Sequence, residues 1–114
     1  MPDQQNKLVY WQGQNGKLQL NDEGKVYHYF LNKNYNIILG RMVSTEKGIP
    51  DLMINIPNGN RLFVEVKNNK STLSINQILW VANNNEEKTL LAIVNGKKIK
   101  FYDMKIKEVN LDEK

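Results

Sequence analysis

Residues 51–67, DLMINIPNGNRLFVEVK, contain two apolar, strand-like runs separated by Pro57-Asn58-Gly59. A hairpin with a two-residue turn would require Pro57 to donate a backbone hydrogen bond, and proline has no N–H. A three-residue loop avoids this conflict, because Pro57 suits a type I turn and Gly59 suits the left-handed position of the bulge that follows it. We therefore predict a β-hairpin with strands over 52–56 and 61–67.

The three-residue loop also fixes the register of this hairpin. It pairs Ile56 with Asn60, and counting back along both strands places Asp51 opposite Glu65. Lys67 lies two residues beyond Glu65, so its side chain points to the same face. Local turn chemistry thus predicts that two carboxylates and one ammonium group meet at the open end of the hairpin.

The segments before and after the hairpin are predicted to form two helices. Asn21 is a plausible N-cap for a helix over 22–32, which a strand at 37–39 follows, continuing toward 42–43 and then a loop at 44–48. Ser74 and Gln77 match a capping box that starts a helix over 74–84. Its expected buried stripe is Ile75, Ile78, Leu79 and Ala82, with Trp80 and Val81 flanking it.

The remaining pattern predicts a single domain over residues 1–114 of the α/β class, in a mixed α+β form. The continuous apolar run at 90–94 predicts a strand buried on both faces, and Asn95-Gly96 turns the chain into an alternating edge strand at 98–102. The order predicts a mixed sheet with flanking helices and a parallel, right-handed crossover from the 61–67 strand to the 90–94 strand. Residues 1–20 form an N-terminal hairpin or two extended pieces, and residues 107–114 a charged tail.

Composition limits the classes of protein and partner. The net charge of +4 and the pI near 9.3 fit a polyanionic partner or a simple lysine bias equally well. The absence of cysteine excludes disulfides and thiolate zinc sites, and the only histidine, His28, is expected on a helix surface. No apolar run is long enough to cross a bilayer and the start has no signal-peptide pattern, so we expect no membrane partner and a cytoplasmic protein.

Three motifs follow one another in a specific order: Gly-x-Pro-Asp at 48–51, a hydrophobic Glu-x-Lys strand at 65–67, and Leu-Ser-x-x-Gln at 73–77. A Glu-x-Lys strand alone is usually a solvated pair. The combination resembles the PD-(D/E)XK nuclease superfamily, and most closely its VRR-NUC branch, over residues 48–80. The resemblance implies a restriction-endonuclease-like core.

The same resemblance implies a metal site built on oxygen ligands, which Mg²⁺ prefers. Asp51, Glu65 and the carbonyl of Val66 would hold Mg²⁺, with Mn²⁺ as a substitute. Lys67 would hold the attacking water or stabilise the transition state. Gln77 would lie near the phosphate while also capping its helix. An acid from the preceding helix is expected to join the metal site. Glu23 lies on the inward face of that helix, with Asp22 as the competing choice.

Basic residues are candidates for contacts with nucleic acid. Lys47, Arg61 and Lys70 flank the motif and are expected to contact the phosphate backbone, together with Ser74 at the start of the motif helix. Five further lysines follow the last strand turn, and they either track a phosphate backbone or protect an edge strand from pairing. These are Lys97, Lys98, Lys100, Lys105 and Lys107.

The resemblance implies a metal-dependent DNA endonuclease of phage or bacterial origin. By analogy with stand-alone VRR-NUC proteins, we expect a homodimer that cuts branched DNA such as four-way junctions. The alternatives are a flap or single-strand nuclease, a nickase, a nuclease subunit working with a helicase, and a non-catalytic nucleic-acid-binding module that keeps the fold.

Overall fold

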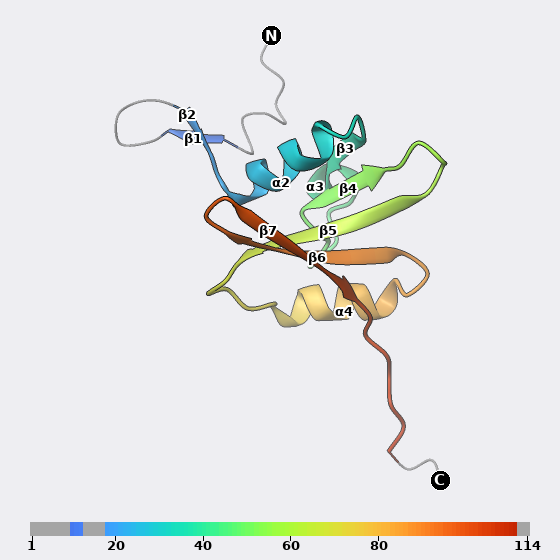
Figure 1. Ribbon diagram of the computed structural model, residues 1–114. Helices are drawn as coiled ribbons and strands as arrows, with labels where there is room; N and C mark the ends of the chain where they lie inside the picture. The colour runs from blue at the N-terminus through green and yellow to red at the C-terminus, as the bar shows by residue number, and fades with distance from the viewer. Residues whose placement is uncertain (1–9, 13–17, 112–114) are drawn as a thin grey trace.

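The computed structural model describes residues 10–12 and 18–111. Its main body is a five-stranded mixed sheet with strand order β3-β4-β5-β6-β7 and one long helix against each face (Figure 1). This α+β arrangement confirms the predicted fold class. The described elements are β1 (Tyr10–Gln12), β2 (Leu18–Leu20), α2 (Asp22–Leu31), β3 (Asn36–Leu39), α3 (Gly40–Val43), β4 (Leu52–Asn55), β5 (Arg61–Asn68), α4 (Ile75–Asn83), β6 (Lys88–Asn95) and β7 (Lys98–Met104).

The β4–β5 hairpin forms with the predicted turn and register. The backbone N–H of Ile56 donates to the carbonyl of Asn60 at 2.8 Å, and that of Gly59 donates to the carbonyl of Ile56 at 3.0 Å. Gly59 has a φ of +90°, the left-handed conformation that the bulge requires. The strand pairs run from Asn55–Arg61 back to Leu52–Val64. The next step along this register brings Asp51 beside Glu65, as the turn chemistry predicts.

β5 extends beyond the end of its antiparallel partner. Its last pair with β4 is Leu52–Val64, whereas its parallel pairing with β6 continues to Asn68–Val94. The predicted parallel crossover through α4 is therefore confirmed. Residues 65–68 of β5 have a strand neighbour on the β6 side only, which leaves a gap in the sheet next to Asp51.

Helices α2 and α4 cover opposite faces of the sheet (Figure 1). Asn21 caps α2 as predicted, because its Oδ1 accepts a hydrogen bond from the N–H of Gly24 at 2.7 Å. Val26, Tyr27 and Phe30 of α2 then pack into the larger of two hydrophobic clusters, over β4, β5 and β6. None of the described helices is long and apolar enough to span a membrane.

The predicted continuation of β3 toward 42–43 is wrong. The chain turns at Gly40 into the short helix α3, and the N–H of Gly40 donates to the carbonyl of Asp51 at 2.7 Å. A Cβ at Gly40 would lie 1.7 Å from the carbonyl oxygen of Pro50. This close backbone approach ends the strand, and it also anchors the segment that carries Asp51.

The capping box of α4 is confirmed, but its predicted buried stripe is wrong. Trp80 is only 6% exposed and its ring lies 4.8 Å from that of Phe63, whereas Ile75 is 74% exposed. The indole N–H of Trp80 also donates to Glu46 at 3.0 Å. The large aromatic side chain therefore sets which side of the helix faces the sheet. The residues expected to be buried form a second apolar side that is exposed at Ile75, Ile78 and Leu79 and half-buried at Ala82.

The last two strands differ in part from the prediction. β6 is buried on its α2 side at Ala92 and Val94, but Leu91 and Ile93 on the other side are only half-buried. β7 is the predicted edge strand, and residues 105–110 after it form no helix or strand. The N-terminal strands β1 and β2 pair antiparallel. The expected turn between them and residues 112–114 of the charged tail lie outside the described residues.

Candidate active site

Asp51 lies immediately before β4 and reaches across the gap to β5. Its Oδ2 accepts a hydrogen bond from the backbone N–H of Val66 at 2.8 Å. A strand residue points its N–H and C=O to the same side, so the Val66 carbonyl faces the same gap. One carboxylate and one carbonyl oxygen are thus brought together where the pairing of β4 with β5 ends.

Glu65 is buried between the sheet and α4, with 2% of its surface exposed. Its pKa is raised from 4.5 to about 9, first by burial and then by hydrogen bonding to Asp51 and by the charge of Asp51, while Lys67 opposes the shift. The carboxyls of Asp51 and Glu65 therefore lie on the same face and close enough to interact directly, as the register predicts.

Gln77 links Glu65 to the start of α4. Its Oε1 accepts from the backbone N–H of Ser74 at 2.9 Å, and its Nε2 donates to Oε1 of Glu65 at 3.3 Å. Because the amide oxygen is taken by the capping box, the amide NH₂ is left to face the acid. Helix capping and orientation of Glu65 are therefore two roles of one side chain.

Glu23 in the first turn of α2 is the third acid near this point. Burial and the charge of Asp51 raise its pKa to about 7, and Arg41 opposes the shift. Its Oε1 is buried without a hydrogen bond, and the nearest cation is Nη2 of Arg41 at 3.5 Å. Asp22 is more exposed and forms an ion pair with Lys25 at 3.8 Å. Between the two competing acids, the structure favours Glu23.

A cavity of about 330 Å³ opens beside these groups at the end of the sheet. We call it the carboxylate cavity, because Asp22, Glu23, Asp51 and Lys67 line it, whereas the buried Glu65 interacts with Asp51 but does not itself line the cavity. Sequence analysis did not identify Asn21, Asn68 or Ser71 as part of the site, although Asn21 had a clear signal as a helix cap. The lining residues are Asn21, Asp22, Glu23, Asp51, Val66, Lys67, Asn68 and Ser71.

The donor set of this cavity fits a small divalent cation. Mg²⁺ keeps several waters and needs only one or two carboxylates. Asp51, Glu65 and the Val66 carbonyl would supply such ligands, and a cation would oppose the effects of burial and of the Asp51 charge, which raise the pKa of Glu65. Within residues 10–12 and 18–111, no three or more His, Cys, Asp or Glu side chains form a metal-binding cluster, so Glu23 is a neighbouring acid and not a preformed third ligand.

Comparison with protein families gives a clear match. The model of the VRR-NUC domain matches residues 2–98, which include α2, the β4–β5 hairpin, α4 and β6. The chain belongs to the VRR-NUC family. The family lies in the PD-(D/E)XK nuclease-like superfamily, which confirms the predicted resemblance, and it assigns this chain a nuclease-type function with DNA as substrate. No curated protein matches the sequence.

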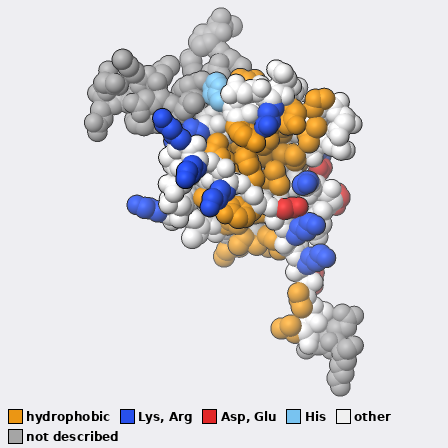
Figure 2. Space-filling view, in the orientation of Figure 1, with side chains coloured by type: hydrophobic (Ala, Val, Ile, Leu, Met, Phe, Trp, Pro, Cys, Tyr) orange, Lys and Arg blue, Asp and Glu red, His pale blue; other side chains and the backbone are white. Residues whose placement is uncertain are grey.

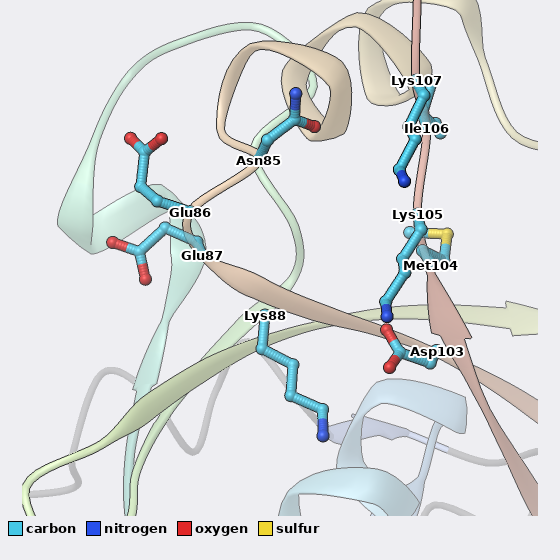
Figure 3. Close-up of a pocket in the computed structure, with 9 residues that line it drawn as sticks. All are labelled: Asn85, Glu86, Glu87, Lys88, Asp103, Met104, Lys105, Ile106 and Lys107. Carbon is cyan, nitrogen blue, oxygen red and sulfur yellow. The ribbon is translucent and has the colours of Figure 1, made fainter.

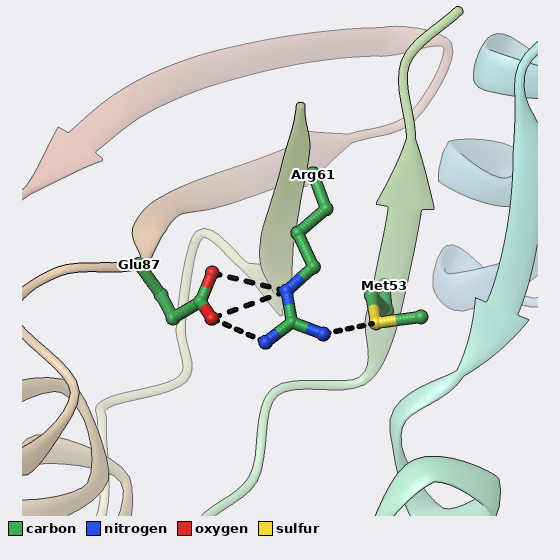
Figure 4. Close-up of polar contacts among 3 residues, drawn as sticks. All are labelled: Met53, Arg61 and Glu87. Atoms are coloured by element: carbon green, nitrogen blue, oxygen red, sulfur yellow. Dashed lines mark hydrogen bonds and ion pairs between the residues drawn. The ribbon is translucent and has the colours of Figure 1, made fainter. Parts of the chain in front are cut away.

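Two of the basic residues expected to flank the motif of this VRR-NUC domain lie elsewhere. Arg61 is four residues before Glu65 on β5, about 13 Å away along an extended strand. Its guanidinium pairs with the carboxylate of Glu87 and contacts the sulfur of Met53 (Figure 4). Lys47 lies in a separate hollow against α4, with Trp80. The predicted contacts of Arg61 and Lys47 with the phosphate backbone remain predictions, and that of Arg61 would require its guanidinium to leave Glu87.

The other two candidates for nucleic-acid contacts are close to the cavity. Lys70 is exposed in the loop after β5, and its backbone N–H donates to Oδ1 of Asn68 at 2.8 Å. Ser74 is engaged in the cap of α4, because its Oγ accepts from the N–H of Gln77 at 3.2 Å. Both residues belong to the connection that leads from the cavity to α4, so their predicted contacts with DNA remain predictions.

A larger hollow of about 500 Å³, here called the distal hollow, lies where β6 begins and β7 ends (Figure 3). None of the motif residues lines it. Three acids and three lysines do, so their charges balance. These are Glu86, Glu87, Asp103, Lys88, Lys105 and Lys107. Size alone would favour this hollow, but the crowded acids, the motif and the open strand end all favour the carboxylate cavity.

Proposed function

We propose that this VRR-NUC domain is a divalent-metal-dependent endodeoxyribonuclease whose active site is the carboxylate cavity. The observation that carries the proposal is the position of Asp51 and Glu65, two interacting carboxyls at an open strand end with Lys67 on the same face. A structural pair would be neutralised by a partner cation. Here burial and mutual repulsion raise the pKa of Glu65 instead.

The roles of the residues follow from their surroundings. A bound Mg²⁺ or Mn²⁺ would supply charge neutralisation at the scissile phosphate and activation of water. Asp51 is oriented for binding by the backbone of Val66, and Glu65 by Gln77. Lys67 brings a compact positive charge to the phosphate. Glu65 must release its proton to act as a ligand, so metal binding is coupled to proton release.

We also propose that the protein acts as a homodimer on branched DNA. The exposed apolar side of α4 supports a dimer, because Ile75, Ile78 and Leu79 lie on a helix without a single charged residue. An uncharged surface meets a second copy of itself without like-charge repulsion, whereas DNA offers it no charge complementarity. Two cavities in one symmetric particle would suit a substrate with two strands to cut.

The experiment is a cleavage assay on a supercoiled plasmid, a linear duplex and fluorescent nicked, flapped and four-way substrates with Mg²⁺, Mn²⁺ or EDTA. We expect metal-dependent cleavage, preferred on the four-way junction and lost in Asp51→Ala with DNA binding retained. Binding without product in any metal would instead support a non-catalytic module. Equal cleavage of duplex and junction would refute the branched-DNA selectivity, and product mapping separates flap cleavage and nicking.

A further inference from the structure

The exposed face of β7 lies in register with the acids and the lysine of the active site. Across β5, β6 and β7, the backbone pairs place Lys67, Ile93 and Lys100 in one line. The neighbouring line consists of Glu65, Leu91 and Tyr102. Residues paired across strands point to the same face, and strands are about 4.8 Å apart. The backbone positions of Lys100 and Tyr102 are therefore about 10 Å from those of Lys67 and Glu65.

Burial confirms which face of β7 carries these side chains. The alternate residues Ile99 and Phe101 pack against the hydrophobic cluster under α2. Lys98, Lys100 and Tyr102 therefore project on the opposite face, the side of α4. All three are exposed, and Tyr102 retains 50% of its surface. We call these three residues the β7 row.

The β7 row lies at the end of the sheet where the carboxylate cavity opens. Nζ of Lys25 on α2 donates to the carbonyl of Gly96 at 3.0 Å, which holds the β6–β7 turn beside the start of α2. Figure 2 shows Lys and Arg side chains on both sides of the molecule, and red acids lie among those on the right but not among those on the left, where Figure 1 places the β6–β7 turn and the connection from β5 to α4. In the described part of the chain, neither Lys98 nor Lys100 forms an ion pair.

The structure divides the five lysines that sequence analysis had grouped together. Lys105 and Lys107 line the distal hollow beside three acids. Lys97, Lys98 and Lys100 lie at or near the β6–β7 turn instead, with no acidic residue between positions 95 and 102. Protection of an edge strand would explain lysines anywhere on β7. It does not explain an exposed tyrosine in line with Glu65, which leaves a large apolar ring open to a ligand.

We propose that the β7 row binds unpaired nucleotides of the DNA strand that leaves the active site, with Lys98 and Lys100 neutralising phosphates and Tyr102 stacking on a base. Lysines that follow a backbone give sequence-independent affinity, and an exposed aromatic ring stacks on any base that is not already stacked in a duplex. The inference rests on the proposed nuclease function and deepens it, because it names a contact with nucleotides that separate from their partner strand at the branch, beside the cut site.

The test measures binding of a fluorescent single-stranded oligonucleotide by anisotropy in EDTA, so that cleavage plays no part. Lys98→Gln/Lys100→Gln is compared with Lys105→Gln/Lys107→Gln, which removes the same charge at the distal hollow. We expect about a tenfold loss of affinity for the first variant, with a salt dependence lower by about 1.4 in slope, and less than about a twofold loss for the second. Circular dichroism checks that both variants are folded.

Tyr102 is tested by a pair of substitutions. Tyr102→Phe keeps the ring and is expected to bind like the wild type, whereas Tyr102→Ala is expected to bind at least about fivefold more weakly. Equal affinity losses in the two lysine variants, or equal binding by the two tyrosine variants, would refute the proposal that the β7 row binds DNA. A wild type that binds through these residues but cuts no substrate would refute the nuclease proposal alone.

Discussion

The two ends of the sheet use the same residue types in opposite ways. Beside the distal hollow, the guanidinium of Arg61 donates hydrogen bonds to the carboxylate of Glu87, and these hydrogen bonds lower the pKa of Glu87. Beside the carboxylate cavity, Glu65 is buried next to Asp51, and burial, together with the hydrogen bonding and charge of Asp51, raises the pKa of Glu65 to about 9. An acid with its own cation is a structural group. Among the described residues, neither Asp51 nor Glu65 forms an ion pair, and two such neighbouring acids form a site that a cation from solution can complete.

The same substitution, glutamate to glutamine, made at each end of the sheet gives the largest expected difference in cleavage rate. Glu65→Gln removes a metal ligand and should lower the cleavage rate by about 1000-fold, because charge stabilisation at the phosphate depends on the bound cation. Glu87→Gln changes the same group at the distal hollow and should retain the rate within about threefold. Single-turnover cleavage of a four-way junction in Mg²⁺ measures both. Equal losses would mean that the carboxylate cavity is not the active site.

The second prediction concerns the apolar side of α4, which lies between the two ends. Ile75→Glu/Leu79→Glu should weaken self-association by about 100-fold or more, because each apolar side chain buried in a dimer contributes on the order of 1 to 3 kcal/mol. Light scattering after gel filtration measures the mass. Ile75→Val/Leu79→Met is the matched control and should remain a dimer. If the wild-type protein is monomeric at every concentration, the proposal of a homodimer is wrong.

The raised pKa of Glu65 predicts how the metal-free protein responds to pH. The folded protein holds this proton up to about pH 9, whereas the unfolded chain releases it near its ordinary value of 4.5. Between these values the folded state binds more protons, so the free energy of unfolding falls as the pH rises, and Glu65 alone contributes at most about 1.4 kcal/mol per pH unit to this fall. Urea titrations in EDTA at pH 5, 7 and 9 measure this slope.

The Glu65→Gln variant has no titrating group at residue 65, so its free energy of unfolding should fall less across the same pH range. Glu87→Gln is again the control, because it leaves the carboxylate cavity intact and should keep the wild-type slope above pH 5. Identical slopes for the wild type and Glu65→Gln would show that Glu65 is ionised in the folded protein.

The smallest effect is expected at the ion pair of the distal hollow. Arg61 is about half exposed, and exposed pairs contribute only about 0 to 1 kcal/mol. Arg61→Ala and Glu87→Ala should each lower the free energy of unfolding by about 1 kcal/mol or less and leave cleavage unchanged. A double-mutant cycle by urea denaturation measures the coupling. A large loss of cleavage in Arg61→Ala would instead show that its guanidinium leaves Glu87 to contact DNA.

Local chemistry predicted most of what positions the site. The turn at Pro57 and Gly59 fixes the hairpin register and hence the meeting of Asp51 with Glu65, and the capping box fixes the start of α4. These signals act over a few residues, so a single sequence contains them completely.

The failures all depend on contacts between distant segments. α4 offers two apolar sides, and the packing of Trp80 on Phe63 decides which one is buried. Gly40 ends β3 only because the chain near Pro50 approaches its backbone. Arg41, which pairs with Glu23, lies on a short helix that no local pattern predicts. The five C-terminal lysines divide between the two ends of the sheet, and only the register of β6 with β7 reveals this.

The hydrogen bonds of Gln77 limit which residue this position can hold. At the start of an isolated helix, glutamate would serve as well as glutamine, since both offer an oxygen to the Ser74 backbone. In this protein a glutamate there would turn an oxygen toward the buried acid of β5, where the amide now offers hydrogen. The neutral side chain at residue 77 is therefore required by the neighbouring acid on the sheet and not by the helix that it begins.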